Sequence, residues 1–269
     1  MNWLEYLKAV VMGAVEGITE FLPVSSTGHL IITADLIDFH GPLASNFEIV
    51  IQLAAILAIC WLYRGKLLAV MRGLGSDRVS RRFVLNLLVA FLPAAVVGLI
   101  AHEAIKRMLF NPLTVAVALI VGGVIILIVE RLHLPVRVQT VEELRPWDAF
   151  KIGCVQVLSL VPGTSRSGAT IIGGLVFGLS RTAATEFSFF LAIPIMFAAT
   201  GFDLAKNLGQ LNAEYAVVLA IGFAASFVTA VLAVKTFIRF VSRHDFTVFA
   251  WYRIFFGALC LWYYWPRGS

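Results

Sequence analysis

The chain contains the stretch Gly13-Ala-Val-Glu-Gly-Ile-Thr-Glu-Phe-Leu-Pro-Val-Ser-Ser-Thr-Gly-His-Leu-Ile-Ile32, in which polar residues interrupt an apolar sequence. A related stretch, offset by 140 residues without a gap, runs from Gly153 to Ile172. Identical residues occupy the pairs Gly13/Gly153, Val15/Val155, Ser25/Ser165, Gly28/Gly168, Ile31/Ile171 and Ile32/Ile172. In a duplicated membrane protein, the broken polar segments of the two halves usually form one shared active or transport site.

The composition places the chain in a membrane. Hydrophobic residues make up 60% of it and charged residues 14%, and the mean hydropathy is +0.90. Soluble domains average about 45–50% apolar and about 25% charged residues. The length of 269 residues would suit a soluble α/β enzyme, but this composition excludes that class. Basic loops that orient the chain in a membrane account for the net charge of +5, so we expect no nucleic-acid partner.

Apolar blocks lie at about 7–24, 44–63, 84–101, 113–129, 152–178, 187–205, 214–234 and 246–265. A spanning helix needs about 20 apolar residues, and six blocks fit a simple span. The two repeat blocks are interrupted by Pro23 and Pro162, each followed by Ser, Thr and Gly, which favour helix ends and turns. We therefore expect a re-entrant helical hairpin in each repeat block, because irregular backbone at that depth must be buried in protein or line a wet cavity.

The predicted architecture is an all-α polytopic membrane protein that forms a single membrane domain over residues 1–269. It has six transmembrane helices and two re-entrant helical hairpins that meet near the membrane midplane. The first repeat covers residues 1–132, a cytoplasmic linker 133–150, and the second repeat 151–269. Each half holds three spans, and because three is odd, the second half must be inverted relative to the first.

Basic residues predict the orientation. Thirteen of them fall on one side of the predicted topology: Arg64, Lys66, Arg72, Arg78, Arg81, Arg82, Arg131, Arg137, Arg145, Lys151, Lys235, Arg239 and Arg243. Five fall on the other: Lys8, Lys106, Arg107, Lys206 and Arg267. The positive-inside rule puts the thirteen in the cytoplasm and both termini outside. Residues 1–5 have neither a basic region nor a small-residue cleavage site, so we expect no removable signal peptide.

Two carboxylates in the first repeat form a candidate metal site. Glu16 and Glu20 are four residues apart and therefore share a helix face. Burying a charged carboxylate in the membrane is energetically unfavourable unless it is paired, so such residues usually mark a functional site. Their oxygens suit a divalent cation such as Mg²⁺ or Ca²⁺, with phosphate oxygens completing the shell. Alternatively, the pair is satisfied by backbone amides of the broken loop, or it relays protons.

The polar turns predict an anion site. Ser and Thr cap helices well, and a helix N-terminus offers free N–H groups to an anion. Arg166 has no acid within four residues, and its planar fork matches phosphate oxygens. The alternative is a buried ion pair with Glu16 or Glu20. The substrate-binding candidates are Ser25, Thr27, Thr164, Ser165, Arg166 and Ser167.

The repeat offset aligns Ser26 with Arg166, so a nucleophile and a cation would face each other where the two loops meet. His29 follows closely and is expected near Ser26 and the carboxylates, where its near-neutral pKa would suit acid/base work. A structural role is the alternative for this histidine.

The motifs Glu16-Gly-Ile-Thr-Glu-Phe-Leu-Pro-Val-Ser-Ser-Thr-Gly-His29 and Pro162-Gly-Thr-Ser-Arg-Ser-Gly-Ala-Thr-Ile171 closely resemble the two signatures of the undecaprenyl pyrophosphate phosphatase family, the bacitracin-resistance proteins. The resemblance implies a phosphoric-anhydride hydrolase of the bacterial inner membrane. This enzyme converts undecaprenyl diphosphate, a C55 isoprenoid, into the monophosphate carrier for peptidoglycan and other wall polymers, and needs Mg²⁺ or Ca²⁺. By analogy, the catalytic residues are Ser26 as nucleophile, His29 as acid/base, Arg166 as phosphate clamp, and Glu20. Glu16 and Glu20 bind the metal or position water.

Several alternatives stay open at this stage. Water held by the metal could attack directly, with Ser26 only binding phosphate. A lipid-phosphate flippase or transporter would use the same midplane anion site without cleavage, and a non-catalytic lipid- or antibiotic-binding protein would also tolerate it. The expected partners are undecaprenyl diphosphate and the phospholipid bilayer, with a homodimer as a further possibility.

Overall fold

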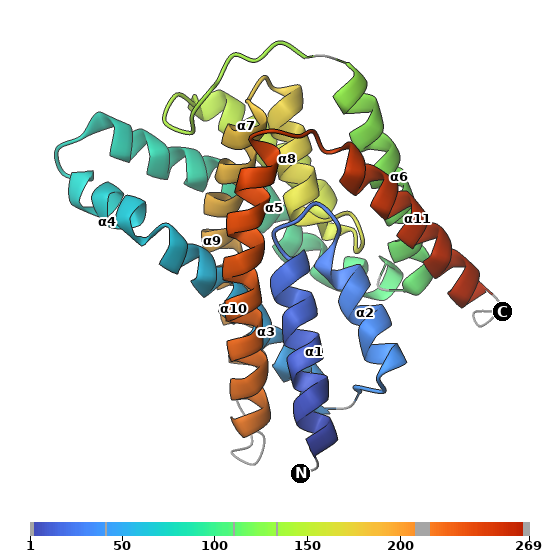
Figure 1. Ribbon diagram of the computed structural model, residues 1–269. Coiled ribbons are helices and arrows are strands. Elements are labelled where there is room, and N and C mark those ends of the chain that lie inside the picture. Colours follow the sequence, from blue (N-terminus) through green and yellow to red (C-terminus); the bar gives the residue numbers. More distant parts are fainter. Residues whose placement is uncertain (1–2, 41, 110, 133, 208–215, 266–269) are drawn as a thin grey trace.

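The computed structural model describes residues 3–40, 42–109, 111–132, 134–207 and 216–265. Within these ranges the regular elements are helices. One isolated β-bridge pairs Val138 with Leu179, which both lie outside the helices. The predicted all-α class is therefore confirmed, and Figure 1 shows long helices surrounding shorter helix pairs.

Each repeat motif forms a helix, a turn and a second, short helix. The first pair is α1 (Trp3–Thr19) and α2 (Ser26–Leu36); the second is α7 (Pro146–Gln156), the short 3₁₀ helix η1 (Val157–Leu160) and α8 (Arg166–Val176). α7 begins inside the predicted linker 133–150, since a proline is well tolerated in the first turn of a helix. In Figure 1 the α1–α2 pair enters from the lower end and α7 from the upper end, with both turns directed toward the middle.

The remaining helices are α3 (Pro42–Leu62), α4 (Arg64–Gly73), α5 (Arg78–Leu109), α6 (Pro112–Arg131), α9 (Arg181–Asn207), α10 (Ala216–Val241) and α11 (Thr247–Tyr264). Among the described residues, α5, α6, α9 and α10 are long and apolar enough to cross a membrane, and α3 with α4 makes a fifth span if that pair, bent by 71°, counts as one. The sequence predicted six spans. α11 falls short because Arg253 and several Trp and Tyr residues lower its hydropathy.

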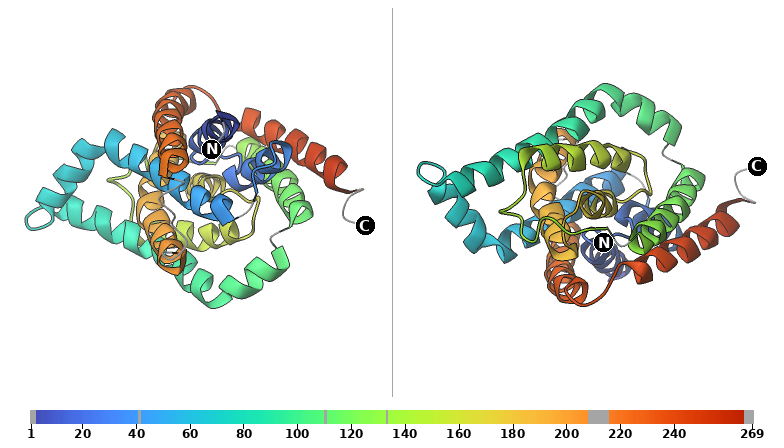
Figure 2. Two further views of the ribbon diagram at one scale, coloured as in Figure 1. Left: turned by 90° about the horizontal axis from the view of Figure 1, so that it is seen from below. Right: turned by 90° about the horizontal axis from the view of Figure 1, so that it is seen from above.

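Small residues let the helices approach closely around the hairpins. A Cβ at Gly13 or Gly17 of α1 would overlap the backbone of α10, and one at Gly123 would crowd the backbone of α11. Such contacts are typical of membrane helices, whose packing depends on close van der Waals contact. α8 is buried from Ser167 to Gly174, and Figure 2 shows it near the centre, with α5 and α6 outside it.

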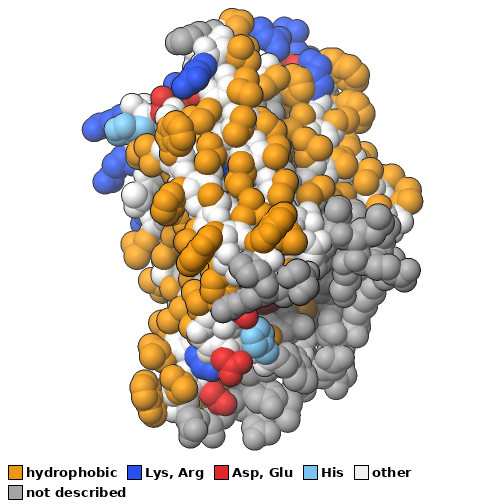
Figure 3. All heavy atoms as spheres, turned by 90° about the vertical axis from the view of Figure 1, so that its right-hand side faces the viewer, with side chains coloured by type: hydrophobic (Ala, Val, Ile, Leu, Met, Phe, Trp, Pro, Cys, Tyr) orange, Lys and Arg blue, Asp and Glu red, His pale blue; other side chains and the backbone are white. Residues whose placement is uncertain are grey.

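The surface is consistent with a membrane environment. Large apolar side chains are exposed along most helices, including Leu99, Ile100 and Phe255. Figure 3 shows hydrophobic side chains over the middle of one face and Lys and Arg gathered at its upper end. This distribution is expected for a protein whose middle faces lipid and whose ends face water.

The three predicted basic segments lie at one end of the molecule. Lys66 forms an ion pair of 2.5 Å with Glu142 of the linker, and Arg82 donates to the backbone oxygen of Glu142. Glu130 at the end of α6 pairs with Arg181 and accepts the N–H of Phe246 at 2.9 Å. These contacts join the segments around residues 66–82, 130–142 and 246 at one end of the molecule. Of the five basic residues expected on the other side, only Lys8 has a described side chain.

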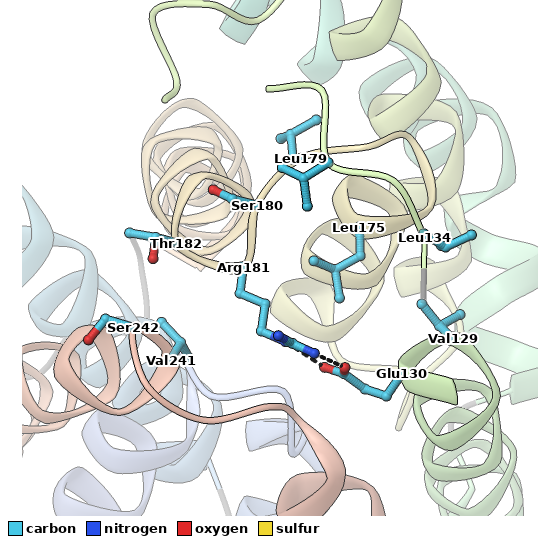
Figure 4. Close-up of a pocket in the computed structure, with 11 residues that line it drawn as sticks. Val129, Glu130, Leu134, Leu175, Leu179, Ser180, Arg181, Thr182, Val241 and Ser242 are labelled. Atoms are coloured by element: carbon cyan, nitrogen blue, oxygen red, sulfur yellow. Dashed lines mark hydrogen bonds and ion pairs between the residues drawn. The ribbon is translucent and has the colours of Figure 1, made fainter. Parts of the chain in front are cut away.

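A cavity of about 480 Å³ lies at this same end. Figure 4 shows its wall, where Arg181 reaches across to Glu130 below the hydroxyls of Ser180 and Thr182. None of the predicted catalytic or substrate-binding residues lines this cavity. The candidate site is instead at the two turns.

Candidate active site

The two turns share an unusual backbone conformation. Ser25 has φ 71° and Ser165, its partner in the repeat, has φ 72°. Both angles fall in the left-handed region, which non-glycine residues rarely occupy and which often marks functional sites. The same local sequence therefore folds in the same strained way in both halves.

The turns are in direct contact. The Ser167 hydroxyl, in the first turn of α8, donates to the backbone oxygen of Leu22 at 2.7 Å. Arg166 reaches from the same turn to Glu20, with 3.1 Å between Nη2 and Oε1. The structure thus brings together the two motifs that lie 140 residues apart in the chain.

Glu20 lies between the predicted nucleophile and the predicted clamp. The Ser26 hydroxyl donates to Glu20 Oε2 at 2.5 Å, while Arg166 occupies Oε1. The carboxylate is 9% exposed, so both contacts are shielded from water. A short hydrogen bond from a hydroxyl to a buried carboxylate is the arrangement in which the carboxylate can take the hydroxyl proton.

Arg166 is held in place yet keeps a free donor. Its Nη1 donates to the backbone oxygen of Ser188 at 2.8 Å and lies 3.3 Å from the Ser188 hydroxyl. Its Nε–H is buried and has no partner in the part of the chain that the structure describes. The buried ion pair with Glu20, which the sequence left as an alternative, is therefore present, and it leaves one guanidinium donor for a ligand.

Glu16 is the second buried carboxylate of the site. It is 2% exposed, and its Oε2 has no hydrogen-bond partner among the described residues, so no backbone amide in that part of the chain satisfies this oxygen. An orphaned carboxylate oxygen suits a hard cation. Among the described residues, however, no group of three or more His, Cys, Asp or Glu side chains could hold a metal, so a cation bound to these carboxylates would take its other ligands from phosphate oxygens or water.

The helix caps differ between the two halves. The Ser165 hydroxyl accepts the N–H of Gly168 at 3.1 Å and caps α8. Ser25 makes no such bond, so α2 begins without a side-chain cap, with Thr27 in its first turn. An uncapped helix start directs N–H groups at whatever lies in front of it, which makes α2 the better anion site.

His29 is bonded elsewhere than expected. Its Nδ1 lies 2.7 Å from the Ser25 carbonyl oxygen and must carry the proton, because that oxygen only accepts. Its Nε2 lies 2.6 Å from the Tyr252 hydroxyl, and Phe256 stacks on the ring at 4.3 Å. His29 therefore contacts aromatic side chains of α11. The expected contact with Ser26 is not among its contacts.

The sequence reasoning missed three residues near the turns: Ser188, Tyr252 and Arg253. Ser188 steadies Arg166, and Tyr252 engages His29. Arg253 is 1% exposed and donates to the carbonyl oxygens of both turns, among them that of Thr164 at 3.0 Å. A lone arginine within an apolar block was the signal that identified Arg166, and it would have identified Arg253 as well.

Comparisons with known proteins agree on one family. The family described as Bacitracin resistance protein BacA matches residues 9–259. The undecaprenyl-diphosphatase of Nitrosospira multiformis is 59% identical over 261 residues, which cover 97% of this chain and 96% of that protein. Undecaprenyl-diphosphatase 2 of Rhodospirillum rubrum is 58% identical over 262 residues, with 97% and 96% coverage. The undecaprenyl-diphosphatase of Laribacter hongkongensis is 54% identical over 265 residues, with 98% and 97% coverage.

Proposed function

The chain belongs to the bacitracin resistance protein family, and from this membership we propose that it acts as an undecaprenyl-diphosphatase. It is a multi-pass membrane enzyme that hydrolyses the C55 isoprenoid diphosphate to the lipid monophosphate and inorganic phosphate. The flippase alternative has no support, because the relatives that match this chain over nearly their whole length are named as diphosphatases.

The observation that carries the mechanism is the partly buried series Ser26–Glu20–Arg166, with Glu20 at its centre and bonds of 2.5 Å and 3.1 Å. A binding site for a phosphate needs the guanidinium and the uncapped helix start. It does not need a hydroxyl that donates to a buried carboxylate. The hydrogen bond from the hydroxyl to the carboxylate therefore supports catalysis rather than binding alone.

In the proposed reaction, the terminal phosphate lies before the N–H groups of α2 and accepts the free Nε–H of Arg166. Ser26 Oγ attacks the terminal phosphorus while its proton passes to Glu20. The bond between that phosphorus and the bridging oxygen breaks, and the lipid monophosphate leaves with the bridging oxygen. Water then attacks the phosphorus of phosphoserine, the P–Oγ bond breaks, Ser26 Oγ regains its proton from Glu20, and inorganic phosphate leaves. Phosphoryl transfer needs mainly positioning and charge stabilisation, which these groups supply.

The donor set fits a divalent cation, Mg²⁺ or Ca²⁺. The orphaned Oε2 of Glu16 would be one ligand, a Glu20 oxygen a second, and substrate phosphate oxygens would complete the shell. When bound, the cation would neutralise charge on the diphosphate. His29, held by Ser25 and Tyr252, orients the start of α2 in this proposal, and Glu20 serves as the base.

We also propose in which membrane the enzyme lies and how it is oriented there. The enzyme lies in the bacterial inner membrane, with the basic end in the cytoplasm and both termini outside. Substrate then enters from the outer leaflet, with its tail between the helices. The homodimer stays a prediction.

Phosphate release from undecaprenyl diphosphate by the purified protein, with and without chelator, tests the activity. Ser26→Ala should lower kcat by at least about 10³-fold, which corresponds to about 4 kcal/mol at 1.36 kcal/mol per decade. Ser242→Ala is the matched control, because its hydroxyl only bonds Arg239 O at the cytoplasmic end. If Ser26→Ala keeps a tenth of the wild-type kcat, covalent catalysis is wrong, and direct attack by water with Glu20 as base replaces it.

A further inference from the structure

Arg253 is a buried cation without a carboxylate partner. Among the described residues it is the bulkiest of the fully buried side chains, and it lies in the middle of α11. No ion pair between its guanidinium and a carboxylate is present in the described part of the chain. An ionised side chain inside a membrane protein is costly and usually serves function. The proposed roles of the two motifs leave this charge unexplained.

The guanidinium binds backbone oxygens from three separate segments. Nη1 lies 3.1 Å from Pro23 O in the first turn, and Nη2 lies 3.1 Å from Gly163 O and 3.0 Å from Thr164 O in the second. The remaining contacts are to α6, with Nη2 3.2 Å from Ala118 O and Nε 3.3 Å from Leu119 O. One side chain thus joins both turns to a spanning helix.

The surroundings are shaped to admit this group. A Cβ at Gly122 of α6 would overlap Nη2, and the atoms nearest to that position all belong to Arg253. A Cβ at Gly168, one turn into α8, would lie 3.2 Å from Nη1. Glycines on two helices therefore leave the space in which the guanidinium lies beside the turns.

We propose that Arg253 is a positioning residue of the phosphatase site: it fixes the turn before α8 against the turn after α1, so that Arg166 and Ser26 meet the same phosphate. This inference rests on the proposed function. Lysine could not replace it, because an ammonium offers three donors from one point and cannot span carbonyls of three segments. Misplacing reacting groups by about 1 Å costs on the order of 10²-fold in rate.

Two variants disturb the guanidinium in different ways. Arg253→Lys keeps the charge and removes the fork, and we expect kcat to fall about 100-fold with KM within about threefold of wild type. Gly122→Ala keeps the arginine and displaces it, and kcat should fall at least about tenfold. Gly201→Ala is the matched control, because a Cβ there meets nothing within 4 Å. Each variant is purified as the full chain, and its thermal unfolding is recorded beside its kinetics.

A double-mutant cycle separates positioning from general stability. If Arg253 acts by placing Arg166, Arg253→Lys added to Arg166→Lys should lower kcat by less than about threefold beyond Arg166→Lys alone. Arg181→Lys, at the distant ion pair with Glu130, should combine additively with Arg166→Lys. Gly122→Ala decides the matter if Arg253→Lys does not accumulate as folded protein.

A Gly122→Ala or Arg253→Lys protein with kcat within threefold of wild type would overturn the role of Arg253, and so would an additive cycle. A wild-type protein that releases no phosphate would instead refute the proposed function. The two failures are therefore distinct.

Discussion

Arg166→Lys is expected to abolish most turnover although it conserves the charge. In the structure, Nη1 is held by Ser188 O at 2.8 Å and Nη2 by Glu20 at 3.1 Å, which leaves Nε–H for the substrate. A lysine ammonium can reach one of these partners but has no third, coplanar donor to offer the phosphate. Loss of one preorganised donor to developing charge costs about 2.7–4 kcal/mol, so kcat should fall about 10²- to 10³-fold.

The assay for this variant is phosphate release at saturating substrate and metal by the purified full-length protein. Arg181→Lys is the control, because it changes an exposed arginine whose ion pair with Glu130 is far from the turns, and it should stay within about threefold of wild type. An Arg166→Lys enzyme that retains more than a tenth of wild-type kcat would refute the inference that the guanidinium fork contacts the transferred phosphate.

Four further predictions concern other parts of the molecule. Ser25→Ala should lower kcat only about tenfold, because the hydroxyl makes no capping bond and at most a phosphate hydrogen bond of about 1–2 kcal/mol is lost; a loss beyond 10³-fold would make Ser25 a nucleophile candidate. Ser165→Ala removes the cap of α8 and should destabilise the fold by about 1 kcal/mol, seen as a lower unfolding temperature. Glu16→Gln should raise the Mg²⁺ concentration needed for half-maximal activity, and an unchanged metal titration would argue against Glu16 as a ligand. A cysteine introduced at the open position Gly75 should react with impermeant maleimide only from the cytoplasmic side, and labelling from outside would reverse the orientation.

The repeat carried most of what the sequence could predict about the site. Its register paired Ser25 with Ser165, and these residues share the same left-handed backbone. It also paired Ser26 with Arg166, which lie on either side of Glu20. Contacts that follow from this register are foreseeable, because both halves use the same local chemistry to end one helix and begin the next.

Other contacts depend on helices far away in the chain and were not foreseeable. Tyr252 and Phe256 of α11 hold His29, although more than 220 residues separate Tyr252 from that histidine. The serine at the start of α8 caps its helix and the matching serine at the start of α2 does not. Nothing in the two similar motifs predicts this difference. These features arise from tertiary packing, which local propensity does not encode.

The ion pair between Glu20 and Arg166 has a consequence for the order of events in a turnover. Before substrate arrives, Glu20 neutralises Arg166 through Nη2, so the guanidinium is not left as a lone charge away from water. In the proposed reaction, Glu20 becomes neutral when it takes the proton of Ser26, and its attraction for Arg166 weakens at that moment. In this proposal the guanidinium, already bound to the phosphate through Nε–H, then interacts more strongly with the phosphate as the attack proceeds. When Glu20 returns the proton to Ser26 Oγ, the carboxylate regains its full attraction for Arg166 and weakens the hold of the guanidinium on inorganic phosphate, so that one proton transfer both starts the reaction and favours product release.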